Sequence, residues 1–323
     1  YKGNKIVQAQ LDVAALSGES EDILSEMEEC VCPSFGACPS MGTANTMQMT
    51  GEILNLVLPG TSTIPSIDNL KLRKCREAGR AIVEMTKADR KPSDLITKET
   101  LLNAIAFAMA TAASTNIVLH LIAIANELSI KITLDDFDEY AKRLPCIVGV
   151  IPSGPYTVVD FNYAGGPLAV MKMIEKEIYT DVPTMDGRTW KELLANIEVK
   201  SSDVIRSLDN PLYTEPGLKI LKGNLSPTGS IVRPTGVPEE MKQFSGKAKV
   251  FSSDLDSYEA IERGEIVPGD VIVIRYEGCV GAPGMTELMV TTDALIAKGL
   301  HKSVGLISDA RFSGFNYGAI VGH

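Results

Sequence analysis

Residues 215–236 read EPGLKILKGNLSPTGSIVRPTG, and the pattern of the chain changes within this stretch. From here onward glycine and proline recur at short intervals, and the runs between them are short and β-branched, which indicates strands joined by turns. On the N-terminal side, apolar residues recur at three- and four-residue spacing, which is typical of amphipathic helices. We therefore predict two domains, a helix-rich one over 1–218 and a β-rich one over 219–323 that resembles a small barrel or sandwich.

The expected elements follow from this spacing. In the first domain the pattern predicts helices over 44–58, 68–88, 99–111, 116–128, 134–143, 166–178 and 187–196. A short apolar run over 146–151, followed by a Pro-Ser-Gly turn, predicts a buried strand in the same domain. In the second domain we expect strands over 230–233, 248–252, 270–276 and 303–308, and helices near 255–263 and 285–298.

The composition excludes several classes of protein. The chain has 323 residues, 31 Lys and Arg against 41 Asp and Glu, and a net charge of −10, so it lacks the concentrated positive face that nucleic acids and anionic membranes require. It contains no apolar, charge-free stretch of about eighteen residues, so no segment is expected to span a bilayer. Six cysteines, three of them crowded at Cys30, Cys32 and Cys38, do not form a secreted disulfide framework. We expect a soluble protein of a reducing compartment, the cytoplasm or an organelle interior.

Residues 30–46, CVCPSFGACPSMGTANT, are the densest candidate site. Thiolates bind soft or borderline metals, and a glycine-containing loop that leads into a helix offers backbone N–H groups to sulfur or other anions. The spacing C-x-C-x5-C matches neither a zinc finger nor a ferredoxin, so this segment does not supply a complete four-thiolate site. The alternative is structural, because free cysteines are often small buried residues in a tight turn.

Two later segments also place polar groups in loops. Residues 278–288, GCVGAPGMTEL, form a glycine-rich turn that is expected to enter a helix with Glu287 in its first turn. The helix dipole alone explains an acid there, and a carboxylate at a loop mouth is also a suitable ligand for Mg²⁺. Residues 308–318, SDARFSGFNYG, come at the end of an expected strand. Loops that follow strands often carry functional residues, so the polar side chains here are candidates for a site. The alternative is structural, because a Ser-Gly pair is also common in ordinary turns.

Taken together, these segments resemble the family of dihydroxy-acid dehydratases and phosphogluconate dehydratases, which also includes the sugar-acid (aldonate) dehydratases. The resemblance covers essentially the whole chain and includes five further motifs in the family's order: ASTN at 113–116, PSG at 152–154, DFNYAGG at 160–166, IRSLDNP at 205–211 and GNLSPTG at 223–229. It implies an α/β fold with a partial α/β/α N-terminal domain and a truncated, β-barrel-like C-terminal domain. The chain is accordingly expected to be a fragment, because it has no counterpart of the family's N-terminal region with two further cluster cysteines, Mg²⁺-binding aspartates and a lysine.

The resemblance also implies a reaction. Family members remove a proton from C2 and the hydroxyl from C3 of a 2,3-dihydroxy acid, and the resulting enol becomes a 2-keto acid. They use an iron–sulfur cluster, of the 2Fe–2S or 4Fe–4S type, with one open iron at the C3 oxygen, and Mg²⁺ at the carboxylate end. Carried over to this chain, Cys38 is a cluster ligand, Glu287 is a Mg²⁺ ligand and Ser313 is the catalytic base, whereas Cys30 and Cys32 are neighbours of the site.

We therefore expect a hydro-lyase, and several motifs favour a sugar acid such as a pentonate as its substrate. The alternative substrate is the dihydroxy acid of branched-chain amino-acid biosynthesis, 2,3-dihydroxy-isovalerate. A rival of another class is a non-catalytic metal-binding scaffold whose cysteines hold zinc or merely pack. The expected partners are a small hydroxy-acid substrate and further copies of the chain, in a homodimer or homotetramer, with neither nucleic acid nor membrane.

Overall fold

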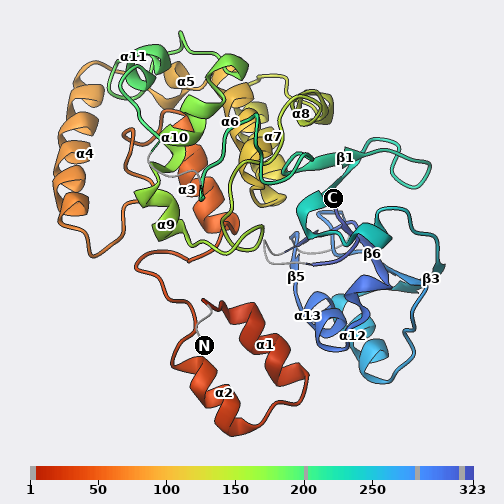
Figure 1. Ribbon diagram of the computed structural model, residues 1–323. Helices are drawn as coiled ribbons and strands as arrows, with labels where there is room; N and C mark the ends of the chain where they lie inside the picture. The colour runs from red at the N-terminus through yellow and green to blue at the C-terminus, as the bar shows by residue number, and fades with distance from the viewer. Residues whose placement is uncertain (1–4, 200–202, 281–283, 313–316) are drawn as a thin grey trace. The chain divides into compact units, whose positions relative to one another are not determined.

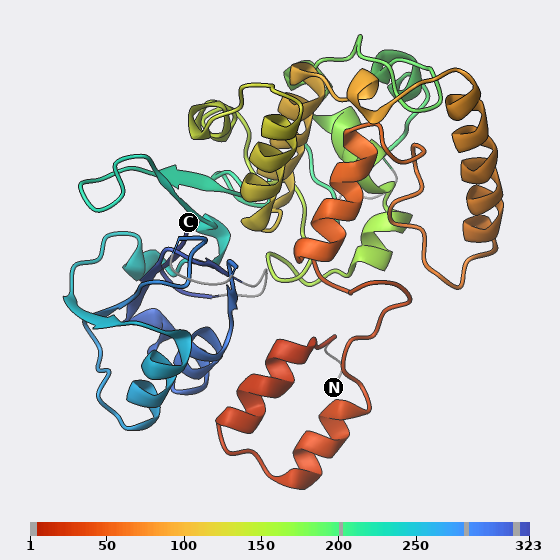
Figure 2. The same ribbon diagram turned by 180° about the vertical axis from the view of Figure 1, so that it is seen from behind.

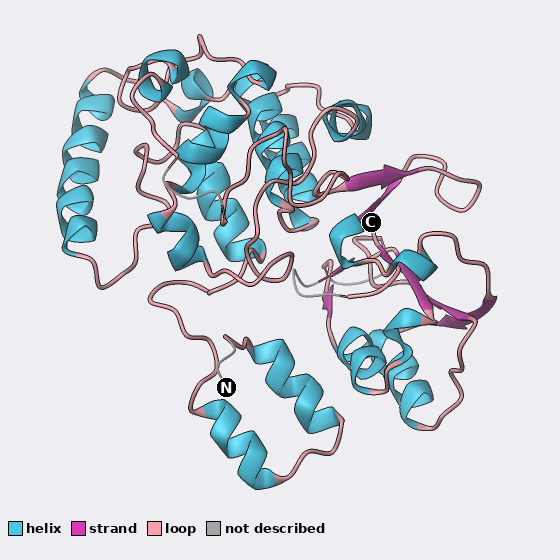
Figure 3. Cartoon of the chain, viewed as in Figure 1, coloured by secondary structure: helices cyan, strands magenta, loops and turns pink. Residues whose placement is uncertain are grey.

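The chain folds into two compact units. The computed structural model describes residues 5–199, 203–280, 284–312 and 317–323. Residues Ser34–Gly217 make up the helical unit, and the residues up to Pro33 together with Leu218–His323 make up the sheet unit. Helices fill the helical unit, whereas the strands lie in the sheet unit (Figure 1, Figure 3). The predicted α/β class is therefore confirmed.

The helical unit is built around one central helix. Its elements are α3 (Thr43–Ile53), α4 (Asn69–Lys87), α5 (Pro92–Leu95), α6 (Lys98–Thr111), α7 (Asn116–Glu127), α8 (Leu134–Ala141), α9 (Val158–Tyr163), α10 (Gly166–Met173), the 3₁₀ helix η1 (Glu175–Glu177) and α11 (Trp190–Leu194). Helix α6 packs against α3, α7, α8 and α10, and Figure 2 shows this group from behind. Among the described residues, no helix has both the length and the apolarity that crossing a membrane requires.

Helix α6 is central because most of its residues after Glu99 are apolar, and it is buried from Thr100 to its end. Thr97 begins it: the Thr97 N–H donates to Thr100 Oγ1 at 2.8 Å, and the Thr100 N–H donates back to Thr97 Oγ1 at 3.4 Å. At the other end the Gly217 N–H donates to the carbonyl of Met109 at 2.7 Å. A Cβ on Gly217 would lie 2.4 Å from the Ala112 nitrogen, so only glycine allows the chain to leave the helical unit here.

The predicted helix over 44–58 is shorter than expected, because α3 ends at Ile53. Asn55 adopts a left-handed backbone with φ of 63°, which asparagine tolerates better than most residues. The Leu56 N–H then donates back to the carbonyl of Gly51 at 2.9 Å and satisfies one of the last carbonyls of the helix. The helix therefore stops at a local turn, five residues before its predicted end at residue 58.

The expected strand over 146–151 is present as isolated bridges. Cys146 pairs with Tyr213, and Val148 pairs with Ile205, both in antiparallel fashion. Each bridge joins only one pair of residues. The segment is therefore extended and buried, but it does not form a continuous strand ladder.

The sheet unit contains a parallel sheet covered by helices. Its elements are α1 (Gln8–Leu16), α2 (Glu21–Glu28), β1 (Lys219–Leu221), β2 (Ser230–Val232), η2 (Pro234–Gly236), η3 (Glu239–Met241), β3 (Lys247–Phe251), α12 (Asp254–Glu262), β4 (Asp270–Ile274), β5 (Glu287–Leu288), α13 (Val290–Ala297), η4 (Leu300–Lys302), β6 (Gly305–Ser308), β7 (Arg311–Phe312) and β8 (Ile320–Val321). Strands β3, β4, β6 and β8 are parallel neighbours in that order, and the described pairings do not close into a barrel. Parallel strands need crossover connections, which α12 and α13 supply. Ile272 and Leu306 of the sheet share one core with Ala260 of α12 and Ala294 of α13.

The predicted helix over 285–298 begins later than expected, and the placement of Glu287 in its first turn is wrong. Glu287 lies in β5, where it pairs in parallel register with Arg311 of β7. Helix α13 starts only after this strand, and its first turn is capped from a distance: the Thr291 N–H donates to the Asp254 carboxylate at 3.3 Å. The helix dipole therefore does not account for the acid at position 287.

Helices α1 and α2 run side by side as a hairpin (Figure 1), and α1 packs against α13. Three carboxylates lie close together here. Asp293 of α13 is only 6% exposed, and Asp12 and Asp254 lie near it. Burial, and then the charges of these two neighbours, raises the pKa of Asp293 to about 7. The folded protein thus holds a proton on Asp293 over a pH range in which the unfolded chain releases it.

Replacing Asp293 by asparagine is expected to raise the free energy of unfolding at pH 8 by about 1–2 kcal/mol, after allowance for solvent screening. Because the folded-state pKa is raised, the stability of the native protein falls as the pH rises from about 4 to about 7, and the penalty is fully present above that range. Urea unfolding at pH 5 and pH 8 measures both effects. If Asp293→Asn leaves the pH dependence of stability unchanged, this account of the residue is wrong.

Candidate active site

The loop that carries Cys38 leads into α3 and is pinned at several points. The Asn45 side-chain amide donates to the carbonyls of Cys38 and Ser40, each at 2.7 Å. The Val158 N–H donates to the carbonyl of Pro39 at 2.8 Å, and this anchor comes from the start of α9. The loop is therefore anchored both by the helix that follows it and by a segment distant in the sequence.

The Cys38 thiol lies partly exposed at this loop and forms no disulfide with another described cysteine. Its Sγ is 3.1 Å from Ser40 Oγ. A fixed, accessible thiol suits one ligand of an iron–sulfur cluster, because iron in such clusters prefers thiolate. Within the described ranges, no three His, Cys, Asp or Glu side chains gather as ligands of one metal ion. The described residues therefore fit as single ligands and do not complete a site by themselves.

A buried polar network ties the ASTN motif to the start of α3. Ser114 Oγ and Thr43 Oγ1 are 3.0 Å apart, and the Asn116 side-chain amide donates to Thr43 Oγ1 at 2.8 Å. The Ser114 N–H donates to Thr46 Oγ1 at 3.0 Å. Two motifs that lie about seventy residues apart in the sequence thus meet at the helix that follows the Cys38 loop.

Glu287 and Arg311 face each other across the β5–β7 pair. Arg311 Nη1 lies 3.9 Å from Glu287 Oε1, and both side chains are partly exposed. Arg311 Nε donates to the carbonyl of Met285 at 3.0 Å, which holds the guanidinium beside the strand pair. The carboxylate of Glu287 is therefore accessible and suits an oxygen ligand of Mg²⁺. Ser313, the predicted catalytic base, comes directly after β7 but lies outside the described residues.

A pocket of about 670 Å³ opens at the carboxyl ends of β4, β6 and β8 in the sheet unit. In open α/β sheets, ligands bind at this end of the strands. The lining is mainly apolar and includes Leu221, Leu225, Val273, Met285, Ile307 and Val321. Arg275 and Asp309 are among its charged residues.

Asp309 shapes the wall of this pocket. Its carboxylate accepts hydrogen bonds from the N–H groups of Tyr276 at 3.0 Å and Glu277 at 3.2 Å, so the loop after β6 holds the turn after β4. A Cβ on Gly278 would lie 2.5 Å from the Asp309 carbonyl oxygen, so the first glycine of the glycine-rich turn permits a close backbone approach. Asp309 thus positions the segment that leads towards Glu287.

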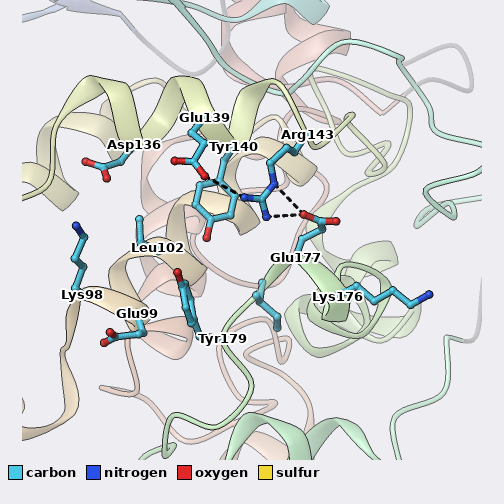
Figure 4. Close-up of a pocket in the computed structure, with 11 residues that line it drawn as sticks. Lys98, Glu99, Leu102, Asp136, Glu139, Tyr140, Arg143, Lys176, Glu177 and Tyr179 are labelled. Atoms are coloured by element: carbon cyan, nitrogen blue, oxygen red, sulfur yellow. Dashed lines mark hydrogen bonds and ion pairs between the residues drawn. The ribbon is translucent and has the colours of Figure 1, made fainter.

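Figure 4 shows another pocket, of about 490 Å³, in the helical unit between α6, α8 and residues 176–179. The Arg143 guanidinium donates to Glu177 at 3.0 and 2.6 Å and to Glu139 at 3.2 Å, and it lies 4.8 Å from the centre of the Tyr140 ring. Burial is the main reason that the pKa of Tyr140 is raised to about 12, so its phenol stays protonated at neutral pH. These pairs join α8 to η1, and none of the predicted site residues lines the pocket. We assign it a structural role.

The predicted site residues are distributed over both units. Cys38 belongs to the helical unit and Glu287 to the sheet unit, so their convergence on one cavity stays a prediction. Sequence reasoning gave no individual role to Ser40, Asn45 or Asp309. The signal that could have found them is their position directly beside the predicted ligands and strand ends, where side chains often hold a loop.

Comparison with known proteins gives one consistent family. Residues 4–193 match the sequence model described as dihydroxy-acid/6-phosphogluconate dehydratase N-terminal, and residues 203–323 match the corresponding C-terminal model. A protein named dihydroxy-acid dehydratase from Caldicellulosiruptor bescii is 44% identical over 306 residues, which cover 94% of this chain and 55% of that protein. Proteins of the same name from Methanococcus maripaludis and Methanothermobacter thermautotrophicus are each 43% identical, over 94% and 100% of this chain and 55% and 60% of their own lengths. The chain thus spans little more than half the length of these curated relatives.

Proposed function

Because the chain belongs to the dihydroxy-acid/6-phosphogluconate dehydratase family, we propose that its protein is a hydro-lyase that converts a 2,3-dihydroxy acid into a 2-keto acid. The observation that carries this proposal is the match to both family models, in order, over nearly the whole chain. The relatives' shared name favours a dihydroxy acid such as 2,3-dihydroxy-isovalerate over the sugar acid that the motifs led us to expect.

In this proposal each predicted residue has one task. Cys38 Sγ would hold one iron of a cluster, and the Glu287 carboxylate would help to hold Mg²⁺. When bound, the two groups supply Lewis-acid polarisation of the leaving hydroxyl and of the substrate carboxylate. Ser313 Oγ would take the proton from C2. Around them, Asn45 keeps the Cys38 loop in place and Asp309 keeps the turn after β4 in place, so the ligands need little rearrangement when substrate binds.

The intact protein, prepared without oxygen, is expected to form a 2-keto acid from 2,3-dihydroxy-isovalerate with kcat/KM at least about tenfold above that for a pentonate. The keto acid is measured as its hydrazone, and iron, acid-labile sulfide and zinc are measured on the same sample. Faster turnover of the pentonate would restore the sugar-acid assignment. No turnover of either substrate would defeat the hydro-lyase proposal, and bound zinc without sulfide would support the metal-binding scaffold instead.

A further inference from the structure

We propose that Ser40 is a positioning residue for the cluster ligand: its hydroxyl donates a hydrogen bond to Cys38 Sγ and raises the reduction potential of the cluster held there. This inference rests on the proposed function, because it concerns a cluster bound through Cys38. It adds a residue of this chain that does not itself bind iron but sets the electronic properties of the residue that does.

The contact itself is short and sheltered. Ser40 Oγ lies 3.1 Å from Cys38 Sγ, within hydrogen-bond distance for sulfur, and Ser40 is only 7% exposed. In the free thiol either atom has a proton to donate. A cysteine that binds iron is a thiolate without a proton, so in the loaded protein only the Ser40 hydroxyl can be the donor. Among the described residues, the hydroxyl of Ser40 contacts no other acceptor, which leaves it available for the sulfur.

The backbone around Ser40 fixes this geometry. The Asn45 amide holds the carbonyls of both Cys38 and Ser40, and the Met41 N–H donates to the carbonyl of Ile151 at 2.7 Å. Both sides of Ser40 are therefore anchored to different elements. A small displacement that would break the contact with sulfur would also break these buried hydrogen bonds, each of which stabilises the fold by about 1 kcal/mol.

The expected effect follows from charge. Reduction adds an electron to the cluster and its sulfurs, and a hydrogen bond to a ligating sulfur stabilises that added negative charge. Removing the hydroxyl therefore lowers the reduction potential. We expect the ratio of reduced to oxidised cluster at a fixed solution potential to fall about tenfold, which for a one-electron couple corresponds to about 59 mV.

The test compares three variants of the intact protein, loaded anaerobically with iron and sulfide. Ser40→Ala removes the hydroxyl, Ser40→Thr keeps it, and Ser62→Ala is a control in the same unit that removes another buried serine hydroxyl, one that is not the hydrogen-bond partner of Cys38 Sγ. Cluster content comes first, from iron and sulfide analysis, and the midpoint potential follows from a redox titration monitored by electron paramagnetic resonance. We expect a lowered potential for Ser40→Ala and wild-type values for the other two.

The outcomes separate this inference from the proposed function. A Ser40→Ala protein that holds a full cluster at the wild-type potential overturns the role of Ser40 and leaves the hydro-lyase proposal intact. If Ser40→Ala loses its cluster, restoration of both cluster and potential by Ser40→Thr supports the hydroxyl, and failure of Ser40→Thr to restore them overturns it. A wild-type protein that takes up no cluster defeats the proposed cofactor and this inference together.

Discussion

Replacing Cys38 by serine is expected to remove iron and acid-labile sulfide from the anaerobically purified protein and to lower 2-keto acid formation by roughly a thousandfold. A serine hydroxyl is a hard, weakly acidic ligand, whereas iron in a cluster binds soft thiolate. Loss of a Lewis acid that contributes about 4 kcal/mol to transition-state stabilisation gives a rate effect of this size. Metal and sulfide analysis measures the first effect, and the keto-acid assay measures the second.

Cys75→Ser provides the control for this experiment. Cys75 lies on α4 and is exposed, so the substitution exchanges the same atoms without touching the loop of Cys38. We expect it to keep both cluster and turnover. A Cys38→Ser protein that retains a full cluster would show that residue 38 is a packing residue of a tight turn, which is the structural alternative that the sequence left open.

Replacing Glu52 by alanine is expected to lower the free energy of unfolding by about 3 kcal/mol. Glu52 is 1% exposed in α3, and its two carboxylate oxygens accept hydrogen bonds from the N–H groups of Gly60 at 2.7 Å and Ser62 at 3.0 Å. Burial raises the pKa of Glu52, and these hydrogen bonds oppose the shift by favouring the charged form. Alanine would leave two backbone donors of the 60–62 loop without their acceptor. Urea unfolding monitored by circular dichroism measures the change.

Glu84→Ala is the comparison for Glu52→Ala. Glu84 lies on the exposed side of α4, and both side chains of its ion pair with Lys87 are exposed to solvent. Such pairs contribute little, so we expect a change within about 0.5 kcal/mol. Equal effects of the two substitutions would mean that the Glu52 carboxylate does not hold the loop after α3.

The sequence predicted the helices well wherever their ends are set by local residues. Spacing alone placed α4, α6 and α7 within about one residue of their observed bounds. It failed where a distant group decides the end, as at α13, whose start is capped by Asp254 from another helix. It also could not show what covers an apolar face: Leu72 and Ile82 of α4 recur at helical spacing, yet both are exposed.

The candidate site was also predictable from the sequence only in part. Residue patterns and the family resemblance singled out Cys38 and Glu287, because each lies in a short motif that can be recognised in one dimension. The partners of these residues could not be predicted. The contact between Cys38 and Ser40 depends on the detailed path of a loop, and Arg311 reaches Glu287 only because two strands distant in sequence pair with each other.

The arrangement of the sheet unit has a consequence for biosynthesis. Helix α1 emerges from the ribosome about 270 residues before α13, the helix against which it packs. At 5–20 residues per second, roughly 14–54 s separate the two events, and the whole helical unit is translated in between. Among the described residues, the hairpin's own cluster consists of Ile6, Leu11 and Met27, with Ala14, Ile23, Leu24 and Val31 packed against it, and during that interval the contact with α13 is missing. Nascent chains that stall before α13 would therefore display this hairpin undocked, as a ready substrate for chaperones and proteases.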